Sequence, residues 1–190
     1  MKYCSECGNP VTSEERALVG ASRFVCTVCG SIFHQSPRLA AACIAEWKGQ
    51  ILLCRRAVQP AAGLWGLPAG FLAARESASA AAARETLEEA GVDVEDLRPY
   101  GVMHIPDNDQ LRVVYLGRLV DNHFKAGPEA LEAGLFGEAQ IPWEDLAFAT
   151  TRHALKRYFA DRQTGIFGFF FADIVPVNAQ PHARSRPRAR

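Results

Sequence analysis

The chain has 190 residues, 48% of them hydrophobic and 22% charged, which suits one globular core with a small addition. No apolar run approaches the roughly 20 residues of a membrane span, and the start lacks the apolar stretch of a signal peptide, so we expect a cytoplasmic protein without a membrane partner. The zero formal net charge hides a split: residues 1–177 carry 17 basic against 21 acidic side chains, and residues 178–190 carry four arginines and no acid.

Two cysteine pairs, Cys4 with Cys7 and Cys26 with Cys29, dominate the first 30 residues. A glycine follows each pair and permits a tight turn that aims backbone amides at thiolates. Two such knuckles with an 18-residue spacer predict a tetrahedral Zn²⁺ site, which is structural because four thiolates leave no open position. Disulfides and a thiol redox pair are the competing interpretations. The missing secretion signal argues against disulfides. The presence of two matched cysteine pairs argues against a single redox pair.

We place the zinc ribbon at residues 1–36, a larger domain at 37–175 and a basic tail at 176–190. The tail is more typical of a solvated, disordered end than of a nucleic-acid site, so a nucleic-acid partner is not expected. In the larger domain, apolar runs predict strands at 39–47, 50–55, 100–105, 111–120 and 131–136, and helical spacing predicts a helix at 149–162. Residues 167–175 are expected to form a last strand or an extended segment.

The strongest helix signal lies between Ser77, a suitable N-cap, and Gly91, a C-terminal stop. On this helix Glu85, Glu88 and Glu89 share one face. Like charges at these spacings each destabilise a helix by roughly 0.2–0.5 kcal/mol. A hard divalent cation would relieve that repulsion, and oxygen ligands favour Mg²⁺ or Mn²⁺. An acidic solvated face with Glu–Arg pairs is the alternative interpretation.

The spacing around this helix resembles the Nudix box, G-x5-E-x7-R-E-U-x-E-E-x-G-U, where U is an aliphatic residue. Thr86 stands at one aliphatic position and is the soft departure. The resemblance implies an α+β Nudix fold, a mixed β-sheet in an α/β/α sandwich, following the zinc ribbon. The charged and glycine positions all match: Gly70, Glu76, Arg84, Glu85, Glu88, Glu89 and Gly91.

The resemblance also implies roles for these residues. Glu85 and Glu89 are the leading ligands for catalytic Mg²⁺ or Mn²⁺, followed by Glu88, and the carbonyl of Ala69 completes the set. Glu76 and Arg84 fit a structural pair between loop and helix better than direct chemistry.

Some of these enzymes use a further glutamate beyond the box as a metal ligand or base. Glu132 is the better candidate here and Glu129 the second. For substrate binding we consider Gln110, Trp65 and Glu129, with plain core packing as the alternative for Trp65.

Beyond the box, the segments Leu67–Phe71, Ile141–Trp143 and Leu146–Phe148, together with the ribbon, resemble one Nudix branch. That branch joins a zinc ribbon to an FAD and ADP-ribose pyrophosphatase domain, and the similarity covers residues 2–171. The zinc-bearing NADH pyrophosphatases instead carry Ser-Gln-Pro-Trp-Pro-Phe-Pro after the box, which the segment 100–108 does not match. Ala73 replaces a glutamate that is common in the favoured branch.

We therefore expect a pyrophosphatase that cleaves FAD or ADP-ribose to AMP plus FMN or ribose 5-phosphate. NADH or a nucleotide-capped RNA is the alternative substrate. A non-catalytic Nudix module that senses ligands or binds nucleic acid is a further alternative, which the intact box opposes. The resemblance leaves a homodimer open.

Overall fold

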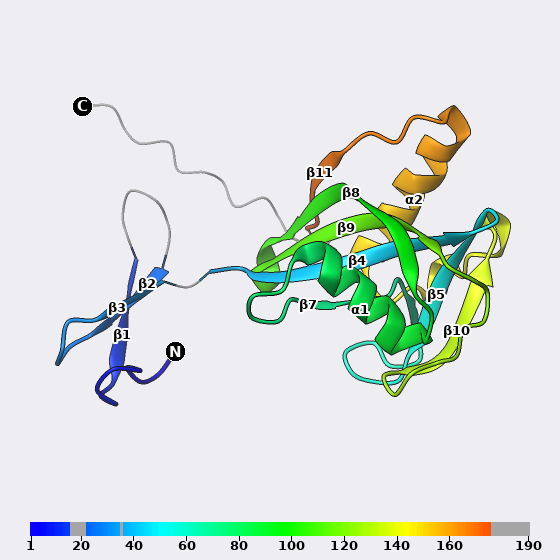
Figure 1. Ribbon diagram of the computed structural model, residues 1–190. Helices are drawn as coiled ribbons and strands as arrows, with labels where there is room; N and C mark the ends of the chain where they lie inside the picture. Colours follow the sequence, from blue (N-terminus) through cyan, green and yellow to red (C-terminus); the bar gives the residue numbers. More distant parts are fainter. Residues whose placement is uncertain (16–21, 35, 176–190) are drawn as a thin grey trace, which may run out of the picture. The chain divides into compact units, whose positions relative to one another are not determined.

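The computed structural model describes residues 1–15, 22–34 and 36–175, and its chain divides into two compact units after Pro37 (Figure 1). The predicted basic tail lies outside the described residues. None of the described helices combines the length and the apolar character that crossing a membrane requires.

The first unit is a three-stranded antiparallel sheet in the order β1-β2-β3. Two cysteine knuckles accompany it. The amide of Gly8 donates to the Cys4 carbonyl at 2.9 Å, and the amide of Gly30 donates to the Cys26 carbonyl at 3.0 Å. Both glycines have φ of 73°, a conformation that side chains disfavour, which explains why glycine follows each pair. The strands are β1 (Val11–Glu15), β2 (Ser22–Cys26) and β3 (Ile32–His34).

The second unit is built on a mixed sheet in the order β10-β5-β4-β9-β8-β11, with β6 paired to β5 and β7 paired to β4. Strands β4 and β9 are parallel, as are β8 and β11, and the other pairs are antiparallel. The strands are β4 (Arg38–Trp47), β5 (Gln50–Arg56), β6 (Trp65–Gly66), β7 (Ala69–Phe71), β8 (Val94–Ile105), β9 (Gln110–Leu119), β10 (Ala130–Phe136) and β11 (Phe170–Asp173).

Two α-helices accompany this sheet, α1 (Ala78–Ala90) and α2 (Ala149–Thr164), with short 3-10 helices η1 (Pro106–Asn108), η2 (Glu138–Gln140) and η3 (Trp143–Asp145). The helix caps predicted from sequence are confirmed. The Ser77 hydroxyl accepts from the Ala80 amide, and Gly91 closes α1 with φ of 64°. Gly165 closes α2 in the same left-handed conformation.

The two helices cover opposite faces of the sheet, as the alternation along β5 shows. Ile51 and Leu53 pack into the core on the α2 side, while Leu52 and Cys54 pack into the core on the α1 side. Because successive strand residues point to opposite faces, a strand buried on both sides reads as one continuous apolar run. The predicted mixed sheet between helices is confirmed (Figure 1).

Strand β8 differs most from its predicted length, and β11 is shorter than the segment 167–175 that was expected to form a last strand or an extended segment. Strand β8 begins at Val94 rather than at Tyr100. Its pairing with β9 shifts register between Glu95 and Arg98 and again between Pro99 and Gly101. These irregularities and the proline disturb the alternation by which a strand is recognised in sequence.

Candidate active site

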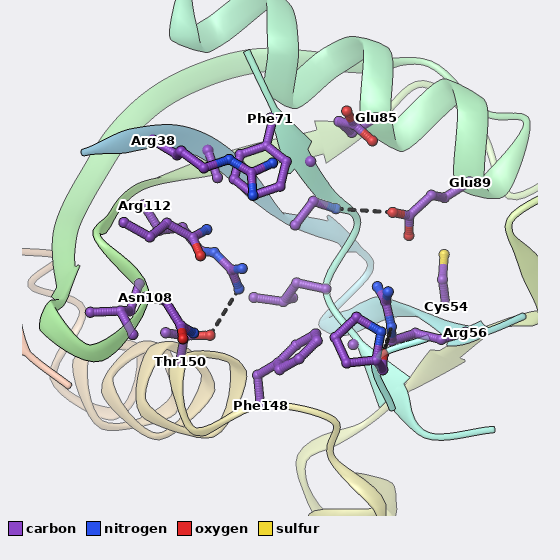
Figure 2. Close-up of a pocket in the computed structure, with 18 of the residues that line it drawn as sticks. Arg38, Cys54, Arg56, Phe71, Glu85, Glu89, Asn108, Arg112, Phe148 and Thr150 are labelled. Atoms are coloured by element: carbon purple, nitrogen blue, oxygen red, sulfur yellow. Dashed lines mark hydrogen bonds between the residues drawn. The ribbon is translucent and has the colours of Figure 1, made fainter. Parts of the chain in front are cut away.

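A cavity of about 1180 Å³ lies between the second half of α1, the loop that ends in β7, and the start of α2 (Figure 2). One part of its wall is acidic and comes mainly from α1. Another part is basic and aromatic. The charged and aromatic residues of the wall are Glu85, Glu88, Glu89, Asp107, Glu129, Arg38, Arg56, Arg84, Arg112, Phe71 and Phe148.

The carboxylates of α1 reach the backbone of the loop before it. A Cβ added to Gly70 would lie 1.9 Å from Oε1 of Glu85, so only glycine leaves room for this carboxylate. The amide of Ala69 donates to Oε1 of Glu89 over a long 3.4 Å. The loop therefore contacts Glu89 through the Ala69 amide, and metal binding by the Ala69 carbonyl stays a prediction.

Arg84 ties this loop to α1. Its guanidinium donates two hydrogen bonds to Glu76, at 2.7 and 3.0 Å, and one to the Phe71 carbonyl at 3.1 Å. Its Nη1 also donates to Glu85 at 2.7 Å and to Glu88 at 2.9 Å. The hydrogen bonds from Arg84 lower the pKa of Glu76 to about 2. Arg84 and Glu76 therefore join loop to helix.

Burial makes Glu85 and Glu89 costly to ionise. It raises the pKa of Glu89 to about 7, with a further contribution from the nearby Glu85 charge. Burial also raises the pKa of Glu85. Two partly buried carboxylates with hard oxygen donors fit Mg²⁺ or Mn²⁺, which would offset this cost.

Glu88 is a weaker candidate ligand than Glu85 and Glu89, because its side chain is 57% exposed and forms an ion pair with Arg84. In the described ranges, the four ribbon cysteines are the one group whose ligand atoms already lie within 4.8 Å of one another. The glutamates of α1 do not form such a preassembled group.

In the ribbon, the cysteine sulfurs converge. The Sγ atoms of Cys4 and Cys29 are 3.6 Å apart, and Cys7 lies 3.5 Å from both Cys26 and Cys29. None of the four is in a disulfide. A Zn–S distance of about 2.3 Å in a tetrahedron separates sulfurs by roughly 3.8 Å. The geometry fits the predicted structural Zn²⁺.

Of the four candidates outside the box and its adjoining loop residues, Gln110, Glu129, Glu132 and Trp65, two line the cavity: Gln110, which is 8% exposed, and Glu129. Glu132 does not, and its preference over Glu129 is corrected. Glu132 pairs across the strands with Arg55, and its carboxylate lies 3.8 Å from the Arg55 guanidinium. Because Arg56 lines the cavity and strand side chains alternate, Arg55 and Glu132 face away from it.

Trp65 also lies outside the cavity wall. Its ring packs edge-on against Phe136, with centroids 4.9 Å apart, beside the core under α2. The assignment of Trp65 to substrate binding is corrected in favour of core packing.

Sequence reasoning missed the basic part of the wall. Arg112 donates from Nη1 to the hydroxyl of Thr150 at 2.8 Å (Figure 2). The ring of Phe148 lies 5.2 Å from the Arg56 guanidinium carbon and 5.7 Å from that of Arg112. The available signal was Arg112 itself, a charged residue inside an apolar strand run.

Comparison with protein families gives two matches that together cover most of the chain. The NUDIX domain model matches residues 36–163. The Nudix N-terminal zinc-ribbon model matches residues 2–35.

Among solved structures, a NUDIX hydrolase from Nitrosomonas europaea is 41% identical, with a TM-score of 0.86 over 92% of this chain and 99% of that one. Among curated proteins, the NAD-capped RNA hydrolase NudC of Pseudomonas aeruginosa is 27% identical over 85% of this chain. The ADP-ribose pyrophosphatase of Methanocaldococcus jannaschii is 32% identical over 56% of this chain. The chain spans 56% of the first curated relative and 65% of the second.

Proposed function

This chain belongs to the Nudix family, and from that membership we propose that it is a pyrophosphatase acting on a substrate in which a diphosphate links adenosine to a second group. The observation that carries the proposal is the pairing of Glu85 and Glu89 against the Ala69–Gly70 loop, inside a cavity with an opposing basic wall. The carboxylates suit a cation, and the arginines suit the anionic substrate.

Glu85 and Glu89 would hold Mg²⁺ or Mn²⁺, with Glu88 as a further ligand. The cation would polarise the phosphoryl oxygens and neutralise charge on the departing phosphate. Arg84 and Glu76 fix the loop, and Gly70 leaves room for the Glu85 carboxylate. Glu129, which lines the cavity, replaces Glu132 as the carboxylate beyond the box.

For the second group of the substrate, the names of the relatives favour NAD-type nucleotides and ADP-ribose. A human relative at 24% identity is named an NAD(P)H pyrophosphatase. FAD, which was expected from sequence together with ADP-ribose, finds no support in these names. We therefore place NADH and NAD-capped RNA first, ADP-ribose next and FAD last.

A substrate panel tests this proposal. The purified chain is incubated with NADH, NAD-capped RNA, ADP-ribose and FAD in Mg²⁺ or Mn²⁺, and products are separated by chromatography. We expect AMP from NADH and from ADP-ribose, 5′-monophosphate ends from the capped RNA, and no product when EDTA is present. Turnover of none of the four substrates would contradict the proposed function. Fastest turnover of FAD would reverse the substrate order.

A further inference from the structure

The basic part of the cavity wall combines three sources of positive potential from distant parts of the chain. Arg56 stands at the end of β5, Arg112 stands on β9, and the first turn of α2 supplies Ala149 and Thr150. Figure 2 shows Arg112, Thr150 and Phe148 on one side of the cavity, with Glu85 and Glu89 across from them on α1.

Arg112 carries a charge that lacks a direct ion pair among the described residues, and the charge of Glu89 acts on it only from a distance. In the part of the chain that the structure describes, no carboxylate lies within ion-pair distance of Arg112 or Arg56. The Nε of Arg112 is buried and finds no hydrogen-bond partner among those residues. Burial and the neighbouring Arg56 charge lower the pKa of Arg112 to about 10. An unpaired buried charge is costly, and an anion would remove that cost.

The N-terminus of α2 adds to this potential. The helix is 16 residues long, and its N-cap residue, Phe148, provides no side-chain hydrogen bond. No acidic residue stands in the first turn. Thr150 is only 5% exposed, and its hydroxyl is already held by Arg112. A helix start without a cap leaves amides and the positive end of the dipole available to an anion.

The arginines are held in place before any ligand arrives. The Phe148 ring contacts both guanidinium groups within the range of cation–π attraction, and Arg56 also donates to the Pro60 carbonyl at 2.9 Å. If Arg112 served only to tie β9 to Thr150, a neutral donor would do so without the cost of a second positive charge beside Arg56. The geometry is that of a preorganised anion site.

We infer that Arg56, Arg112 and the first turn of α2 form a phosphate subsite, which binds the phosphate of the substrate diphosphate that lies farther from a cation on Glu85 and Glu89. This inference rests on the proposed function. The substrate would then be held at two ends, by a cation on Glu85 and Glu89 and by the guanidinium groups opposite. Charge-assisted hydrogen bonds from arginine to phosphate are among the stronger ones in proteins.

Calorimetric titration in EDTA tests the subsite without catalysis or the cation. AMP is the probe, and adenosine is the matched ligand without phosphate. We expect the wild-type chain to bind AMP, and Arg112→Gln and Arg56→Gln each to weaken that binding at least tenfold. Adenosine binding should change less than twofold in both variants.

Arg55→Gln is the matched control, because Arg55 precedes Arg56 on the same strand and faces away from the cavity. It removes the same charge and should leave AMP affinity within twofold of wild type. Thermal unfolding establishes that each variant is folded, and if Arg112→Gln is not, Arg56→Gln and Arg112→Lys decide. The lysine variant keeps the charge but loses the planar fork, so it too should lose affinity.

The result separates the subsite from the proposed function. Glu89→Gln should abolish turnover and should not weaken AMP binding in EDTA, because it removes a negative charge that acts on Arg56 and Arg112. If the wild type binds AMP in the predicted manner but hydrolyses none of the four substrates, the proposed function fails and the subsite stands. No AMP binding by the wild type, or equal binding by wild type and Arg112→Gln, overturns the subsite.

Discussion

The ribbon and the cavity both present candidate metal ligands, but they organise them differently. In the ribbon, the four sulfurs of the knuckles already converge within 4.8 Å. In the cavity, Glu85 is bonded to Arg84, Glu88 points to the same arginine, and Glu89 is buried against the loop. The first set is complete without help from the rest of the chain. The carboxylates of the second set are not converged on one point.

This difference follows from what each site does. A small three-stranded sheet buries little apolar surface, so its stability depends on a closed metal site. A catalytic site needs ligand positions that remain available to substrate, and a large hydrophobic core supports it independently. We therefore expect the ribbon to respond to metal loss by unfolding, and the cavity to respond by losing turnover.

Cys26→Ser should have the largest effect. It removes one of four thiolates from a site whose binding free energy is on the order of 10 kcal/mol, so zinc should be lost and residues 1–36 should unfold. The second unit should keep activity, because its own ligands are oxygens. Zinc content by elemental analysis and protease sensitivity of the ribbon measure this. Cys43→Ala, in the core of the second unit, is the control. Wild-type protein that contains no zinc when purified without added metal would contradict the Cys4 site.

Glu89→Gln should come second, with turnover reduced roughly 10²–10⁴-fold and the fold intact. The change keeps the shape of the side chain and removes the buried charge. Glu88→Gln should lose less, because the Glu88 carboxylate is largely exposed and bonded to Arg84. Steady-state rates at saturating Mg²⁺, with circular dichroism as a check on folding, measure both. Near-normal turnover by Glu89→Gln would remove it from the metal site.

Gln110→Ala should have a smaller effect, which is limited to substrate binding in the cavity. Loss of one hydrogen bond of about 0.5–1.5 kcal/mol should raise KM roughly 2- to 10-fold and lower kcat less. Gln140→Ala on the exposed η2 helix is the control. KM and kcat for NADH and ADP-ribose decide the matter. If KM does not change, or kcat falls equally, Gln110 belongs to the scaffold rather than to substrate binding.

The smallest effect concerns the ion pair of Glu76 and Arg84, which solvent partly screens. Because Arg84 lowers the pKa of Glu76 from 4.5 to about 2, the folded state is stabilised above pH 4.5, and this contribution is lost as the pH falls toward 2. Urea unfolding should find Glu76→Gln less stable than wild type at pH 6, with the gap closing near pH 2. Glu144→Gln provides the control, because the Glu144 side chain is 95% exposed and its only ion pair among the described residues, with Arg152, spans a long 3.9 Å. A gap that does not change with pH would exclude the ion pair as its cause.

Local sequence spacing was sufficient for much of this protein. The turn after each cysteine pair brings two sulfurs together, and residues three or four apart on one helix share a face, so the knuckles and the carboxylates of α1 could be predicted. The caps at Ser77 and Gly91 were predicted for the same reason. Thr86, the departure from the box, is fully buried and bonds the Ala82 carbonyl, so a β-branched residue fits there.

Other features depended on how strands pair. Whether Glu129 or Glu132 reaches the cavity follows from the register of β10 against β5, which shifts between Ala130 and Glu132. A one-residue shift moves a side chain to the opposite face of a sheet, and turn residues do not reveal it. Trp65 could likewise be either a base-stacking or a core residue until its contact with Phe136 was known.

The sequence by itself determined the zinc knuckles and the carboxylate helix, because each depends on neighbours a few residues apart. The mixed sheet was expected from the family resemblance and not from local spacing. Only the tertiary structure brought Arg56, Arg112 and Thr150 to one cavity, from β5, β9 and the start of α2. Their meeting depends on the strand order and on which face each strand presents, and no local spacing encodes it. The physical reason is that side-chain direction repeats within one element, whereas proximity between elements is set by packing of the whole sheet.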